Sequence, residues 1–152
     1  RKLDDDFNVF GELSNGATLV LIASQIAIGH KNDNGLRIHG SKGTLIWSQE
    51  QSEELHFLDG NTRTTYYQNV QVPEMPDVLK TYGRVPAGHH EDFFEALAHL
   101  HTSLERKIRA LKGEKDALPS YEHPGIDAGV LGMKFLQAAV TSSKKKGAWT
   151  AL

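Results

Sequence analysis

Apolar residues in the first 72 positions occur in short runs that turn-forming residues interrupt, which is typical of antiparallel strands. Asn15-Gly16 separates an apolar run at 7–13 from a second run at 17–28, and this dipeptide favours a two-residue hairpin turn. Ser41-Lys42-Gly43 and Asp59-Gly60-Asn61 are further turn signals. The pattern therefore predicts about four to six antiparallel strands.

The run at 17–28 is apolar on both of the faces that a strand presents. Because side chains alternate along a strand, Leu19 and Leu21 point to one face, and Val20 and Ile22 point to the other. Such a strand needs cover on both sides. We expect helices on one face and, on the other face, a second sheet, a domain outside the chain or another subunit.

A helical pattern follows a connection at 72–88 that three prolines interrupt. Apolar residues recur every three or four positions over 93–111, which predicts an amphipathic helix that Gly113 ends. We expect Glu91 and Asp92 to lie in its first turn, where their charges complement the positive end of the helix dipole.

A second helix begins near Pro124 and ends at the basic residues 144–146, which suit its negative C-terminal end. Residues 148–152 then predict a short strand that returns to the sheet. Strands followed by helices are typical of an α+β fold. We expect an open, mainly antiparallel β-sheet with helices packed on one face.

Composition narrows the class of protein. The chain has 152 residues, of which 39% are hydrophobic and 24% charged, as in one ordinary globular domain. It contains no cysteine, which excludes disulfides and thiolate chemistry and leads us to expect a cytoplasmic protein. A net charge of −2 and the lack of a long apolar stretch predict neither nucleic acid nor a membrane as a partner.

The eight histidines do not form a metal-site pattern. His99 and His101 face different directions on a helix, and His89 and His90 are adjacent, so neither pair has the spacing of metal ligands. The chain also lacks a Gly-x-Ser-x-Gly elbow, a Gly-x-Gly-x-x-Gly turn and a Walker-type loop. The residues thus predict no metal site, no serine hydrolase and no nucleotide cradle in this chain.

Three motifs follow one another along the chain. Residues 36–47 have the form L-x-I-x-G-x-K-G-x-L-x-W, and residues 84–93 follow R-x-P-x-G-H-P-E-G-F except at two positions. Residues 124–133 are similar to P-x-x-x-D-G-x-x-G-M. In this order the motifs resemble the C-terminal domain of the Gfo/Idh/MocA (glucose-fructose oxidoreductase / inositol dehydrogenase) family, and the resemblance covers residues 4 to 152.

The chain departs from the family pattern at His90, at Asp92 and in the third motif, where either Ala128 replaces the expected glycine or the motif is shifted by one residue. The loop at 30–35 is longer than in the family, so that either Asn32 or Asn34 can be the matching asparagine. The helix predicted after residue 92 tolerates the first two changes. The choice of asparagine stays open.

The resemblance implies a division of labour between two domains. In this family an N-terminal Rossmann domain binds NAD or NADP, and the C-terminal sheet forms a wall of the substrate pocket and an oligomer interface. The family's catalytic Lys, Asp and His belong to parts that this chain lacks, and Glu114-Lys115-Asp116 has no proline and is a solvated charge cluster. We therefore expect no catalytic residue here.

The chain opens Arg1-Lys2-Leu3 without an initiator Met, which we interpret as a domain cut from a longer protein. We expect residues 1–152 to form a single substrate-binding and oligomerisation domain, with the Rossmann domain outside the chain. The resemblance implies that the whole protein is an NAD(P)-dependent sugar or polyol dehydrogenase and a homo-oligomer through the sheet face. The fragment alone is expected to be inactive.

Candidate substrate-binding residues follow from the same resemblance. Arg84 and His89 at the entry to the long helix, and Gln25 on the central strand, can each hydrogen-bond a substrate hydroxyl. Each also has a structural interpretation. His89 can cap the helix, Arg84 can pair with a surface carboxylate, and Gln25 can bond a neighbour or lie at a subunit interface.

Two rival hypotheses stay open. The first is a non-catalytic carbohydrate-binding or dimerisation module, which a degenerate upstream Gly-rich turn and Glu-Lys-Pro motif would favour. The second is an unrelated α+β fold that shares only its turns. A structure that lacks one continuous antiparallel sheet covered by helices on a single face would favour the second.

Overall fold

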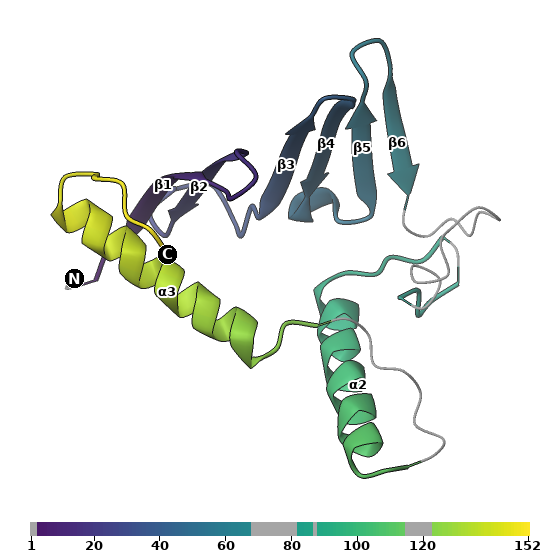
Figure 1. Cartoon of the computed structure of the whole chain (residues 1–152). Coiled ribbons are helices and arrows are strands. Elements are labelled where there is room, and N and C mark those ends of the chain that lie inside the picture. The colour runs from purple at the N-terminus through teal and green to yellow at the C-terminus, as the bar shows by residue number, and fades with distance from the viewer. Residues whose placement is uncertain (1–2, 68–81, 87, 115–122) are drawn as a thin grey trace. The chain divides into compact units, whose positions relative to one another are not determined.

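The computed structural model describes residues 3–67, 82–86, 88–114 and 123–152, and Figure 1 shows their course. The predicted connection at 72–88 lies largely outside the described residues. The elements of the described part are β1 (Asp6–Glu12), β2 (Thr18–Ser24), β3 (Gly35–Gly40), β4 (Gly43–Ser48), η1 (Gln49–Gln51), β5 (Glu54–Leu58), β6 (Arg63–Tyr67), α2 (Phe93–Leu111) and α3 (Ile126–Lys144). They belong to two compact units, Arg1–His30 with Pro124–Leu152, and Lys31–His123.

The predicted turn at Asn15-Gly16 joins β1 and β2 in the first unit, and the two strands pair antiparallel. Gly16 has a φ of 82°, in the left-handed region that glycine enters without steric cost. The Asn15 side-chain oxygen accepts a hydrogen bond from the Ala17 N–H at 3.0 Å. Asn15 thus supplies a side-chain acceptor for the turn, and Gly16 supplies the left-handed backbone conformation.

Helix α3 covers one face of the β1–β2 hairpin. Val9 pairs with Leu21 in register, so Leu21 shares a face with Phe7, whose ring packs edge-on against Phe135 of α3 at a centroid distance of 6.1 Å. Leu21 is 38% exposed, whereas its neighbour Ile22 on the opposite face is 69% exposed. The prediction that one apolar face takes a helix is confirmed, and the second apolar face lies exposed.

Strand β2 is shorter than predicted, because it ends at Ser24 instead of residue 28. The Ser24 hydroxyl accepts a hydrogen bond from the Ile26 N–H at 3.3 Å. The His30 N–H then donates to the Ala27 carbonyl at 3.2 Å. These local bonds turn the chain, so the apolar residues 26–28 do not continue the ladder.

The strand predicted at 148–152 is wrong, because these residues pair with none of the strands in the described part of the chain. The Ala148 carbonyl accepts hydrogen bonds from the Ser142 hydroxyl at 2.8 Å and the Thr150 hydroxyl at 3.2 Å. Trp149 packs edge-on against Phe10 of β1 at a centroid distance of 6.0 Å. The Ala148 carbonyl is therefore bonded to side-chain hydroxyls instead of to a neighbouring strand. Trp149 packs against an aromatic ring instead of joining a ladder.

The second unit contains a four-stranded antiparallel sheet in the order β3-β4-β5-β6. Ile38 lies opposite Leu45, which in turn lies opposite Phe57, so one face is apolar. On the other face the His56 Nδ1 and Thr65 Oγ1 atoms are 3.0 Å apart. This alternation is typical of an antiparallel sheet with one face on a core.

The hairpin between β3 and β4 needs glycine at position 43, where φ is 150°. A Cβ atom there would lie 2.7 Å from the Phe57 ring and would also meet the Leu58 carbonyl. No other residue fits so close to the neighbouring strand. The glycine of the L-x-I-x-G-x-K-G-x-L-x-W motif is therefore explained by packing.

Helix α2 ends where the sequence predicts, but it begins at Phe93, so Glu91 and Asp92 precede its first turn instead of lying in it. Asp92 and Glu95 form a capping box, in which the Glu95 carboxylate accepts the Asp92 N–H at 3.0 Å. At the other end Gly113 has a φ of 76°, and its N–H donates to the Ala110 carbonyl at 3.0 Å. Both ends thus satisfy backbone groups that a helix leaves unpaired.

The α+β class is confirmed, because antiparallel strands precede two helices. The described strands form two sheets instead of one, since no ladder joins β2 to β3 across residues 25–34. Neither described helix is long and apolar enough to cross a membrane.

The exposed face of the β1–β2 hairpin generates a first prediction. We expect this chain to self-associate at high micromolar concentration, because removing apolar surface from water contributes about 25 cal/mol per Å². Ile22→Thr should weaken that association. Leu21→Thr, on the face towards α3, should instead lower the free energy of unfolding by about 1 kcal/mol. Light scattering and thermal unfolding separate the two effects, and a monomeric native chain at that concentration would contradict the prediction.

Candidate functional site

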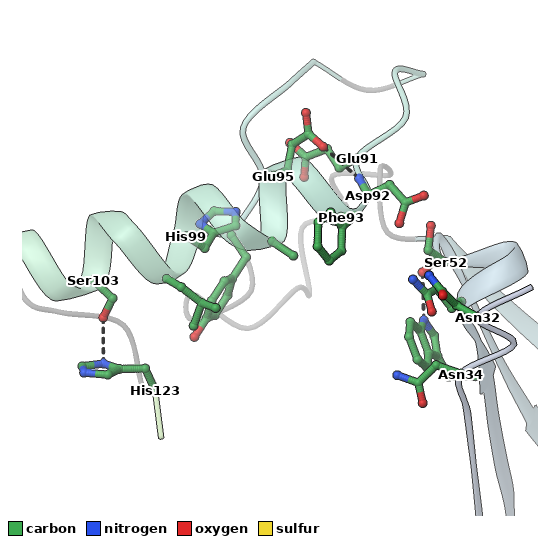
Figure 2. A pocket seen from close by; sticks show the side chains of 15 residues that line it. Asn32, Asn34, Ser52, Glu91, Asp92, Phe93, Glu95, His99, Ser103 and His123 are labelled. Atoms are coloured by element: carbon green, nitrogen blue, oxygen red, sulfur yellow. Dashed lines mark hydrogen bonds between the residues drawn. The ribbon is translucent and has the colours of Figure 1, made fainter. Parts of the chain in front are cut away.

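A cavity of about 700 Å³ lies within the unit formed by residues 31–123, in the size range of ligand pockets. Figure 2 shows the side chains that line it. Aromatic and aliphatic side chains are mixed with amides, hydroxyls, imidazoles and carboxylates; the lining residues are Asn32, Asn34, Trp47, Gln49, Ser52, Tyr82, Glu91, Asp92, Phe93, Glu95, Ala96, His99, Leu100, Ser103 and His123.

Glu91 is the most deeply buried acidic side chain of the described residues, with 3% of its surface exposed. Its Oε1 atom accepts the N–H groups of Arg84 and of Val85, the latter at 2.6 Å. Its Oε2 atom has no hydrogen-bond donor among the described residues. A buried carboxylate oxygen without a donor is costly, so a ligand that donates to Oε2 would be stabilising.

Glu53, in the turn before β5, ties the entry of α2 to the sheet. Its Oε1 atom accepts the Glu91 N–H at 3.0 Å, and its Oε2 atom lies 2.8 Å from the His90 Nδ1 atom. One carboxylate thus bonds both residues that precede Asp92. Because β5 is part of the sheet, these bonds fix the start of α2 relative to it.

The start of α2 adds two more carboxylates to the cavity wall, those of Asp92 and Glu95. In Figure 2 they lie beside Glu91. The hydrogen bond from the Asp92 backbone holds the pKa of the Glu95 carboxyl below its ordinary value of 4.5. Glu95 is therefore ionised at neutral pH, and this wall of the cavity is negatively charged.

Further along α2, His99 and Ser103 lie one turn apart and line the same cavity. The Tyr82 ring packs edge-on against His99 at a centroid distance of 5.3 Å. Ser103 is 1% exposed, and its Oγ atom lies 2.9 Å from the His123 Nδ1 atom. These contacts bring the segments before and after α2 to one face of the helix.

The wall formed by the sheet is held by backbone bonds. The Trp47 indole N–H donates to the Ser52 carbonyl at 3.0 Å, and the Gln49 N–H donates to the Asn34 carbonyl at 2.8 Å. Asn32 and Asn34 both line the cavity, and Figure 2 shows them together with Ser52. Either asparagine of the lengthened loop is therefore placed to contact a ligand.

The predicted binding residues do not line this cavity. Arg84 is bound through its guanidinium to the Thr102 hydroxyl at 2.7 Å. The His89 Nδ1 atom is 3.0 Å from the Pro86 carbonyl, in the turn that leads to α2. Gln25 belongs to the other unit, where its N–H donates to the Asp5 carbonyl at 2.8 Å. Arg84 and His89 thus share the entry segment of α2, and their roles as ligands stay predictions.

The sequence interpretation missed Glu91 as a site residue, because it explained this glutamate by the helix dipole alone. A usable signal was present: Glu91 stands in the motif at 84–93 beside Gly88 and His89. A carboxylate in a turn rich in backbone N–H groups is often a hydrogen-bond acceptor for them. Burial of its second oxygen depends on packing against α2 and cannot be seen in the sequence.

The described part of the chain has no group of three His, Cys, Asp or Glu side chains placed to hold a metal ion. Glu114, predicted to be a solvated charge, has an oxygen 3.8 Å from the Arg109 guanidinium, and residues 115 and 116 lie outside the described part.

Comparisons with known proteins agree on one family. The model of the oxidoreductase family's C-terminal alpha/beta domain matches residues 1–152. An oxidoreductase from Sinorhizobium meliloti is 31% identical with a TM-score of 0.86, over 99% of this chain and 43% of that one. The uncharacterised oxidoreductase YfiI of Bacillus subtilis (strain 168) is 28% identical over 149 residues, 97% of this chain and 37% of that protein.

An inositol dehydrogenase homologue from Azotobacter vinelandii, solved in complex with NADH and myo-inositol, has the same fold. Its TM-score is 0.87 at 24% identity, over 99% of this chain and 40% of that one. The chain thus spans about two fifths of the length of the relatives it matches.

The lowered pKa of Glu95 generates a prediction about pH. A carboxyl whose pKa is lower in the folded state stabilises the fold above its unfolded value, and this contribution is lost as the pH falls through the folded value. Glu95→Gln should therefore lower the unfolding temperature at neutral pH, and the difference from the native protein should shrink below the ordinary value of 4.5. A difference that does not change between pH 7 and pH 3 would show that the charge is unimportant.

Proposed function

Because this chain belongs to the Gfo/Idh/MocA oxidoreductase family, whose C-terminal alpha/beta domain matches all of residues 1–152, we propose that it is the substrate-side domain of an NAD(P)-dependent sugar or polyol dehydrogenase. The whole protein would transfer hydride between nicotinamide and a sugar or inositol hydroxyl. Residues 1–152 would form a single substrate-binding and oligomerisation domain, inactive by itself.

The observation that carries this proposal is the cavity beside Glu91. A fixed carboxylate, two asparagines and aromatic side chains around one hollow suit a ligand with many hydroxyls, which donate to carboxylates and exchange hydrogen bonds with amides. The relative from Azotobacter vinelandii, which has the same fold, was solved with myo-inositol. That likeness supports the substrate class and leaves the individual substrate open.

The described residues do not fit the cofactor. A pyrophosphate binds best at a helix N-terminus that presents free N–H groups without negative charge. The start of α2 instead carries the carboxylates of Glu91, Asp92 and Glu95, and Glu95 already accepts the Asp92 N–H. NAD or NADP is therefore proposed to bind to a Rossmann domain outside this chain, and no step of hydride transfer is assigned to these residues.

Binding roles for the predicted residues remain part of the proposal. Arg84 and His89 belong to the segment that positions Glu91, so a ligand in the cavity would lie next to the turn at 86–89. Gln25 lies in the other unit, so a contact between Gln25 and the substrate would depend on parts of the protein outside this chain. The chain's lack of cysteine supports a cytoplasmic protein, and the exposed face of β1–β2 supports a homo-oligomer.

A second candidate function is a non-catalytic carbohydrate-binding or dimerisation module. The same cavity and the same exposed face would serve it, and no residue that the structure describes separates the two functions. The difference lies in whether the rest of the protein carries the nicotinamide site and the catalytic Lys, Asp and His.

Activity measurements distinguish the two functions. We expect the full-length protein to reduce NAD or NADP with at least one member of a panel of sugars and inositols, and this chain alone to reduce neither. If the full-length protein reduces neither NAD nor NADP, but calorimetry still detects sugar binding, the binding module is favoured.

His89→Ala tests the role of the entry segment. In the full-length protein we expect the KM for the polyol to rise about tenfold, as loss of one hydrogen bond predicts, with cofactor affinity unchanged. Thr141→Ala, which removes an exposed hydroxyl that bonds only the Gln137 carbonyl of α3, is a control. An unchanged KM would mean that His89 only closes its turn onto Pro86.

A further inference from the structure

We propose that Glu91 is a specificity residue whose Oε2 atom accepts a hydrogen bond from a hydroxyl of an uncharged polyhydroxylated ligand, so that the cavity rejects phosphate esters and sugar acids. This inference rests on the proposed function, because it specifies the class of substrate that the same site takes.

Burial is the first reason. Among the described residues only His56, Glu91 and Ser103 are buried, and two of these three line the cavity. A side chain of Glu91's polarity is buried only where its oxygens are satisfied. Oε1 has two donors and Oε2 has none among the described residues. A ligand hydroxyl supplies the missing donor.

Orientation is the second reason. The N–H groups of Arg84 and Val85 hold Oε1, and Glu53 holds the Glu91 backbone. The carboxylate therefore cannot rotate to exchange its oxygens without breaking several bonds. An acceptor fixed in this way loses little entropy when a ligand binds, which favours recognition of a hydroxyl at one position.

Charge is the third reason. Glu91 shares its wall with Asp92 and Glu95, and the described lining residues include no Lys or Arg. Arg84 and His99 both act on Glu95 electrostatically, but the Arg84 guanidinium is bonded to Thr102 and does not line the cavity. A phosphate or carboxylate placed here would meet three carboxylates, and the imidazoles of His99 and His123 are the basic groups among the described lining residues.

Other ligand classes fit less well. A divalent cation would need a group of at least three ligating side chains, which the described residues do not provide. A protonated amine on a sugar ring satisfies the same carboxylate as a hydroxyl does and adds charge attraction. An aminosugar should therefore bind at least as tightly as its neutral parent, which makes it an additional probe.

The test measures affinity by calorimetry on the full-length protein saturated with its preferred reduced cofactor, which prevents turnover of a polyol. Two matched pairs are compared, myo-inositol with myo-inositol 1-phosphate and D-glucose with D-glucose 6-phosphate, and D-glucosamine is added. The native protein should bind the preferred neutral ligand at least about tenfold more tightly than its phosphate. D-glucosamine should bind no more weakly than D-glucose.

Glu91→Gln is the informative variant, because glutamine keeps the shape and can still accept the Arg84 and Val85 N–H groups through one oxygen. Its amide nitrogen replaces Oε2 and turns an acceptor into a donor. We expect the neutral ligand to bind about ten- to a hundredfold more weakly, as loss of a charged acceptor predicts. The ratio of the affinity for the neutral ligand to the affinity for its phosphate should decrease. Glu105→Gln, on the exposed surface of α2 beside Arg109, is the matched control and should change neither.

Each other outcome overturns the inference. If the native protein binds a neutral ligand and its phosphate equally, or if Glu91→Gln weakens both by the same factor, Glu91 only holds the turn at 84–85 and the proposed dehydrogenase stands. If none of the five compounds binds and none is oxidised, the polyol function itself fails. The comparison of neutral ligands with their phosphates is made on the native protein. It therefore tests the inference even if Glu91→Gln folds poorly.

Discussion

One side chain, Glu91, holds together the segments that surround the cavity. Its Oε1 atom accepts two N–H groups from the turn before α2, and its own N–H donates to Glu53 in the turn before β5. Loss of these bonds would free the start of α2 from β5, and with it Asp92 and Glu95. The geometry of the candidate site therefore depends on a buried carboxylate. Its Oε1 atom has donors among the described residues, and its Oε2 atom has none.

The apolar side chains of the described residues are also incompletely covered. No hydrophobic side chain of the described residues is buried, although the chain has the ordinary share of hydrophobic residues. Val20 and Ile22 alternate with Leu21, so one side of β2 faces α3 and the other faces solvent. A domain of this size usually stabilises itself with a core, so covering these faces would be favourable.

The sequence predicted the elements that local chemistry determines. The turns at Asn15-Gly16 and Lys42-Gly43 and the end of α2 at Gly113 all agree with it, because each depends on the backbone freedom of one glycine. It failed where bonds between distant residues decide, as in the tail held by Ser142 and in the role of Glu91. Which polar residues surround a cavity depends on packing, which no periodicity encodes.

A crystal structure of the full-length protein with its cofactor and a bound polyol would show whether this domain holds the substrate while another domain supplies the chemistry. We expect a ligand hydroxyl within hydrogen-bonding distance of the Glu91 Oε2 atom and a nicotinamide ring held by residues outside this chain. A polyol bound away from the start of α2, or a cavity filled by side chains of the protein's other domain, would contradict it.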